Sequence, residues 1–188
     1  MKAIRLAGAV GAVLLLVVVL LSAGCTFATV KPETMFDPPK ERPTVLVLGE
    51  IVVADKLWET YRLHFLRGAE GWLRRNPTSF KDVLVQRPAL LPAGSAVLVG
   101  TITEMEKGSA ALRFFVGMGA GQAKVKGVFE IQGPNGQSHI RFMSQEKYLG
   151  GAGIGGAGIL DLEDLFQRFG ETVAETVAKW VRGEPLEK

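Results

Sequence analysis

The chain has 188 residues, 47% of them hydrophobic, with 22 basic and 19 acidic residues. This length suits one domain of ordinary size. Two of the basic residues, Lys2 and Arg5, lie in an N-terminal segment without acidic residues, so the rest of the chain is close to neutral. A protein that binds nucleic acid through a basic surface carries a clear excess of Lys and Arg. The balance of charge therefore predicts no nucleic-acid partner.

Residues 1–24 have the organisation of an export signal. Lys2 and Arg5 precede an uncharged apolar run over residues 6–21, and small residues follow in "LSAGC" (21–25). A basic start, a short apolar core and small residues before a cleavage site are typical of a signal peptide. A membrane-spanning helix needs about 20 apolar residues, so a permanent transmembrane helix is the weaker interpretation of this shorter run.

Cys25 is the only cysteine, so it has no disulfide partner within the chain. Its context, "LSAGC", resembles the lipobox of bacterial lipoproteins, although Ser22 stands where the usual Leu would be. The resemblance implies cleavage between Gly24 and Cys25, a diacylglycerol on the Cys25 sulfur and an acyl chain such as palmitate on the new amino terminus. Several acyl chains make a stable membrane anchor. The alternative is an ordinary cleaved signal followed by an incidental cysteine.

The residue after the cysteine predicts the membrane. In Gram-negative lipoproteins an Asp at this position commonly marks retention in the inner membrane, whereas this chain has Thr26. By that analogy we expect a lipid anchor in the outer membrane of a Gram-negative cell, with the protein facing the periplasm.

Residues 25–43 are predicted to be the lipidated Cys and a Pro-rich tether. Four prolines fall in "TFATVKPETMFDPPKERP" (26–43), and proline favours extended backbone without amide donors. At about 3 Å per residue such a segment could hold a domain up to about 55 Å from the bilayer. The alternative is an N-terminal arm docked on the domain through Phe27, Val30, Met35 and Phe36.

Residues 44–183 are predicted to form one periplasmic domain. Apolar residues at helical spacing indicate amphipathic helices over 55–76 and 162–182, with Asp55 and Asp161 as N-caps. β-branched or alternating runs predict strands, at 44–53, 82–88, 95–108, 122–131 and 138–148. The expected fold class is α+β: a mainly antiparallel sheet of about five or six strands with the two helices packed on one face.

The stretch "FFVGMGAGQAKVKG" (114–127) raises the question of a phosphate-binding loop. Its glycines match only half of the G-x-G-x-x-G pattern, and the residues after Gly121 alternate with period two, as in a strand. A dinucleotide-binding loop needs a helix directly after it, because the helix N-terminus receives the phosphates. We therefore expect no nucleotide and interpret the segment as a connection between strands.

A second glycine tract, "GGAGIGGAG" (150–158), contains a G-x-x-x-G spacing between Gly151 and Gly155. In membranes this spacing packs helices, but the uncharged run here is too short to cross a bilayer. Two interpretations remain: a flexible loop before the last helix, and a surface for self-association or partner docking that includes Gly151, Ile154, Gly155 and Ile159.

Catalytic groups are scarce. His64 lies on the polar face of a predicted helix and His139 in a predicted strand, and two distant histidines without a second cysteine form no recognisable metal site. Glu104 and Glu106 share a strand face, as many solvent-facing carboxylates do. We expect no enzymatic activity, no metal and no cofactor other than the covalent lipid on Cys25.

The segment "VGTITEMEKGSAALRFFVGMGAGQAKVKGVFEI" (99–131), followed by glycines and an amphipathic C-terminal helix, resembles the bacterial lipoproteins that carry domain of unknown function 4410. The resemblance covers most of residues 44–182 and implies a periplasmic α+β domain without an established activity.

Three functions are compatible with these features. The first is a lipid-anchored envelope protein with a binding or scaffolding domain. The second is a subunit of an oligomeric envelope or secretion-assembly complex, with a homo-oligomer or an envelope protein as partner. The least supported is an enzyme acting on envelope polymers.

Overall fold

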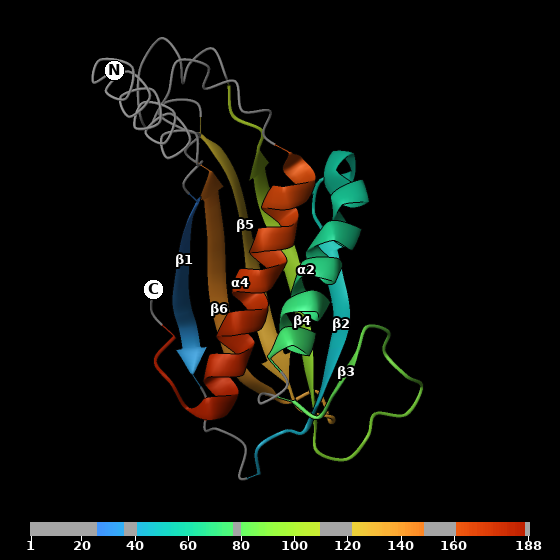
Figure 1. The fold of residues 1–188 in the computed structure, drawn as a ribbon. Coiled ribbons are helices and arrows are strands. Elements are labelled where there is room, and N and C mark those ends of the chain that lie inside the picture. The colour runs from blue at the N-terminus through green and yellow to red at the C-terminus, as the bar shows by residue number, and fades with distance from the viewer. Residues whose placement is uncertain (1–25, 36–40, 77–79, 110–121, 149–160, 187–188) are drawn as a thin grey trace, which may run out of the picture.

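The computed structural model describes residues 26–35, 41–76, 80–109, 122–148 and 161–186. These residues form one mixed sheet of six strands in the order β1-β6-β5-β4-β2-β3, with two long helices side by side on one face (Figure 1). The predicted α+β class, with a mainly antiparallel sheet and helices on one face, is therefore confirmed.

The strands close to the centre of the sheet are those that the sequence predicts. β4 (Ser95–Glu106), β5 (Ala123–Gln132) and β6 (Ser138–Tyr148) form an antiparallel meander. The turn between β5 and β6 has Gly136 at φ 80°, a left-handed conformation that glycine adopts without strain. β2 (Val45–Val53) runs parallel to β4 and to the short β3 (Asp82–Leu84), because the chain returns through a helix between β2 and β3.

Strand β1 (Thr26–Met35) corrects the prediction of a tether. It pairs antiparallel with β6 from Thr26 opposite Tyr148 to Met35 opposite Ile140, and Val30 is buried in the core. Pro32 is compatible with this strand because an edge strand needs partners for only half of its amides. The alternative of an arm docked on the domain is the correct interpretation for residues 26–35.

The first helical region is divided, where the sequence predicts one continuous helix. Asp55 caps a 3₁₀ helix, η1 (Lys56–Tyr61), by accepting a hydrogen bond from the amide of Leu57, and α2 (Arg62–Arg75) follows directly. Phe65 and Ala69 are buried, whereas Trp58, Tyr61 and Trp72 pack at the margin of the core.

Helix α4 (Leu162–Arg182) has the ends that the sequence predicts. Asp161 accepts a hydrogen bond from the amide of Glu163, and Gly183 closes the helix in a left-handed conformation at φ 73°. The two helices run in the same direction, so that His64 lies near Glu163 at their starts and Arg75 pairs with Glu171 further along (Figure 1).

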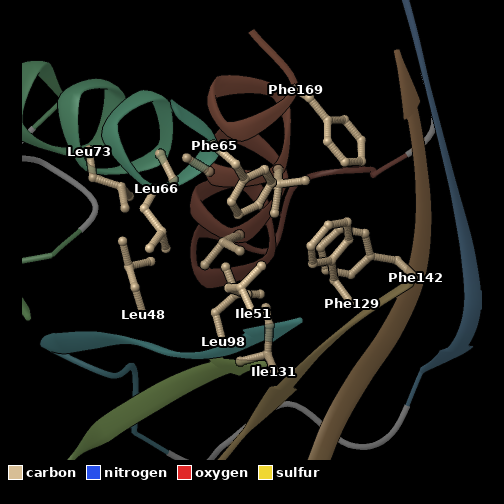
Figure 2. Packing of buried hydrophobic residues seen from close by; sticks show 14 of the residues in the cluster. Leu48, Ile51, Phe65, Leu66, Leu73, Leu98, Phe129, Ile131, Phe142 and Phe169 are labelled. Carbon is tan, nitrogen blue, oxygen red and sulfur yellow. The ribbon is translucent and has the colours of Figure 1, made fainter. Parts of the chain in front are cut away.

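The core lies between the helices and the sheet. Figure 2 shows Phe65 of α2 and Phe169 of α4 meeting Phe129 and Phe142 of the sheet. The rings of Phe65 and Phe129 stack with centroids 5.5 Å apart, and Phe169 meets both edge-on at 5.6 Å. All four phenylalanines are fully buried. This aromatic cluster fixes the helices on the sheet, since such pairs add to the stabilisation that burial alone provides.

The two ends of the sheet differ in what they hold. At the end that we call the anchor end lies Tyr148, which is paired with Thr26 on one side and with Ala123 on the other. The starts of η1 and α4 lie at the same end (Figure 1). The opposite end, called the hairpin end, holds the β5–β6 turn and the C-terminus of α4. Among the described residues, no helix is both long and apolar enough to span a membrane.

Candidate functional site

The second face of the sheet, called the open face, is covered by neither of the described helices (Figure 1). Burial alternates along β5: Val125 and Phe129 point to the helices, whereas Lys126 and Glu130 point away from them. Period-two alternation places one set of side chains on each face of a strand. The open face is therefore built from residues that the strand pattern assigns to solvent.

A ladder of ion pairs crosses the open face near the anchor end. Lys124 Nζ lies 3.1 Å from a carboxylate oxygen of Glu104 and 2.9 Å from one of Glu106, and Lys126 Nζ lies 3.1 Å from Glu104. Hydrogen bonds from Lys126 and Lys124 lower the pKa of Glu104, and hydrogen bonds to Glu106 and Glu104 raise the pKa of Lys124. These groups are solvent-accessible, so the ladder contributes little to stability. The two carboxylates that share a strand face, Glu104 and Glu106, thus have lysine partners, and no catalytic role is needed to account for them.

A hollow of about 700 Å³ lies beside this ladder on the open face. Its walls come from five segments, because β2, β4, β5 and β6 lie side by side and the β3–β4 connection adds Arg87. The polar groups that line it are Glu50, Arg87, Thr101, Thr103, Glu130, Gln132 and Arg141.

Part of this polar lining is already engaged. Gln132 Nε2 donates to Glu130 at 2.9 Å, and Arg141 Nε donates to Glu33 of β1 at 3.0 Å. Within the described part of the chain, Glu50 and Arg87 form neither an ion pair nor a hydrogen bond. The hollow thus offers one carboxylate and one guanidinium to an incoming group.

The mixed lining indicates binding rather than acid–base chemistry. Two carboxylates are present, but Glu130 is held by Gln132, and two guanidinium groups stand among them. Such a surface can donate and accept hydrogen bonds over a broad area, which suits a polar polymer or another protein surface.

A buried polar contact lies on the other side of the sheet, under α4. Glu146 of β6 is 3% exposed, and it accepts a hydrogen bond from Thr172 Oγ1 at 3.0 Å. Thr176 in turn donates to the carbonyl of Thr172 at 2.8 Å. The bond to Glu146 holds α4 on β6, whereas the bond from Thr176 lies within α4. Sequence reasoning missed this contact because Glu146 has the strand position of a core residue.

The two histidines do not come together. His64 Nδ1 lies 3.6 Å from Glu163, whereas His139 lies at the hairpin end with its ring centroid 5.7 Å from that of Trp180. Burial lowers the pKa of His139. Among the residues that the structure describes, no group of three or more His, Cys, Asp or Glu could hold a metal ion.

The predicted lipidation and cleavage residues, Gly24 and Cys25, lie outside the described residues, as do Gly151, Ile154, Gly155 and Ile159. Thr26, the residue that follows Cys25, is described and lies at the anchor end. Tyr148 and Asp161, which flank the second glycine tract, lie at the same end (Figure 1).

Comparison with protein families identifies the central part of the chain. Residues 79–159 match the family described as "Domain of unknown function (DUF4410)". This segment of the chain is therefore similar to a domain of unknown function. The match spans β3 to β6, which is narrower than the residues 44–182 over which the sequence resembles the family. It confirms the resemblance that the glycine-rich segment carries.

The fold around the DUF4410 segment also occurs in solved structures. PelC from Paraburkholderia phytofirmans, described as a dodecamer, and a point variant of it each match with a TM-score of 0.50 at 13% identity. The match covers 81% of this chain and 98% of the PelC chain. At this identity the likeness shows a shared fold. No protein of curated function matches the chain.

Proposed function

We propose that this protein is a lipoprotein of the outer membrane, anchored through Cys25, whose DUF4410-containing domain is a binding or scaffolding module in the periplasm. The observation that carries the proposal is the open face of the sheet. A hollow of about 700 Å³ lies on it, neither described helix covers it, and Glu50 and Arg87 in its lining have no ion-pair or hydrogen-bond partner among the described residues.

The lipid anchor rests on the sequence of the N-terminus. The signal-like residues 1–24 and "LSAGC" support cleavage before Cys25, and Thr26 supports the outer membrane. Globomycin, which inhibits the lipoprotein signal peptidase, should cause a precursor to accumulate, and Cys25→Ser should leave the membrane fraction. If globomycin caused no precursor to accumulate and the Cys25→Ser protein still fractionated with membranes, the two results together would contradict the anchor.

The binding role can be tested by crosslinking from the two faces. A photo-reactive residue at Thr103, exposed on the open face, should capture a partner in intact cells. The same residue at Asp164, exposed on α4, is the matched control. Capture of a partner from position 164 but not from position 103 would show that the helices, and not the open face, form the binding surface.

A second candidate is a subunit of a homo-oligomer. The two PelC structures that share this fold are described as dodecamers, which supports self-association as the second candidate. The surface that would include Gly151, Ile154, Gly155 and Ile159 remains the predicted contact. Native mass measurement of the detergent-extracted protein tests this candidate, and a species that stays monomeric at every concentration would exclude it.

A further inference from the structure

The chain has almost no tether between its anchor and its sheet. Thr26, the residue directly after Cys25, is already paired with Tyr148 of β6. Adjacent Cα atoms are about 3.8 Å apart, so a lipid on Cys25 holds Thr26 within a few ångströms of the lipid headgroups. A tether over residues 25–43 would have allowed about 55 Å.

A short link constrains the orientation as well as the distance. β1 is paired along its length with β6, and β6 continues into a sheet in which every strand is paired with its neighbours. A Thr26 held at a surface therefore keeps the strand ends beside it, at Tyr148 and Ala123, close to that surface. β6 has 11 residues, and at about 3.3 Å per residue the hairpin end lies about 35 Å away along the strand.

The chemistry of the described residues at the anchor end fits a lipid surface. Phe27 is 54% exposed and Leu57 of η1 is 78% exposed, and both lie at this end (Figure 1). Lys56, the first residue of η1, and Lys107, the residue after β4, are exposed there as well. Exposed carboxylates, at Asp55, Asp161 and Glu163, accompany the lysines, so the charge of this end is mixed. The exposed apolar and aromatic side chains carry the fit, because such groups bind at the boundary between headgroups and acyl chains.

We propose that the anchor end is a membrane-contact surface, which the one-residue link from Cys25 holds against the bilayer, so that the strands stand away from the membrane and the hairpin end points into the periplasm. This inference rests on the proposed lipidation of Cys25. It adds an orientation and a contact surface that lipidation alone does not imply.

Single-cysteine labelling tests the orientation, because the only native cysteine is blocked by the lipid. The lipidated full-length protein would be placed in vesicles that contain a headgroup-linked nitroxide quencher. Fluorophores would be attached at Lys56→Cys and Lys107→Cys at the anchor end, and at Leu90→Cys and Asn135→Cys near the hairpin end. All four positions are exposed.

Strong quenching is expected at positions 56 and 107 and little at positions 90 and 135. Equal quenching at all four, or stronger quenching at position 135, would overturn the proposal. Inserting about 20 Gly and Ser residues between Cys25 and Thr26 should abolish the difference, and an unchanged pattern would show that the link does not orient the domain.

Failure of the anchor itself gives a separate result. A protein without lipid keeps a free thiol at Cys25. In a density gradient it stays in the dense fractions, whereas the vesicles float to the top. That outcome contradicts the proposed function, whereas a vesicle-bound protein with uniform quenching contradicts only the orientation.

Discussion

Gly68 of α2 lies directly against the backbone of Gln167 in α4. A Cβ at position 68 would overlap the carbonyl oxygen of Gln167 and lie 2.7 Å from its carbonyl carbon. Gly170 repeats the relationship in the other direction, since its Cβ would overlap the carbonyl oxygen of Phe65. The two helices therefore approach as closely as their backbones allow, and these glycines, which weaken each helix alone, make that approach possible.

Gly68→Ala should destabilise the protein by about 1–3 kcal/mol, because a methyl group against backbone atoms forces the helices apart. Gly71→Ala is the matched control on the same helix. Its Cβ would meet only the end of the Arg75 side chain at 3.4 Å, and replacing a helical glycine should stabilise by up to about 1 kcal/mol. Urea denaturation measures both, and equal effects would contradict the close approach.

Replacing Val30 tests whether β1 is part of the domain. Val30 is 2% exposed, so Val30→Ser should lower the free energy of unfolding by about 1–3 kcal/mol through lost apolar burial and a new buried hydroxyl. Lys31→Ser, at the exposed neighbouring position, should change it by less than about 0.5 kcal/mol. If residues 26–35 were a tether, thermal denaturation would show no difference between the two variants.

Phe129 is expected to be the most sensitive position of the sheet. Its ring stacks on Phe65 and lies over Gly100 and Gly127, where added side chains would overlap it. Phe129→Ala should lower the free energy of unfolding by about 3–5 kcal/mol, because Gly100 and Gly127 have no side chains that could fill the cavity left by the ring. Val128→Ala, on the open face of the same strand, should cost less than about 1 kcal/mol. Similar denaturation midpoints for the two variants would show that the aromatic cluster is not central.

Acid should weaken the hairpin end through His139. Burial lowers the pKa of His139 in the folded state, so the unfolded chain binds a proton more readily. The stability that neutral His139 contributes is present above its unfolded pKa of about 6.5 and is lost as the pH falls through the folded value. His139→Gln should therefore lose less stability than the wild type between pH 7 and pH 5. Parallel melting curves at both pH values would contradict this prediction.

The sequence by itself determined the elements that local rules control. Alternation along residues 122–131 predicted β5, and Asp161 as N-cap of a helix over 162–182 predicted α4. These signals act within a few residues, so the sequence is sufficient to recognise them. The alternation also showed which side chains of β5 face away from the core, although not that a hollow lies there.

Only the tertiary structure decided the role of residues 26–35 and of Gly68. Four prolines favoured a tether, but an edge strand tolerates Pro32, and Val30 gains enough from burial to dock the arm on β6. Gly68 weakens an isolated helix. It becomes favourable only because α4, distant in sequence, packs its backbone directly against position 68, where a side chain would not fit. Both outcomes depend on partners more than 90 residues away in the chain, which no local pattern encodes.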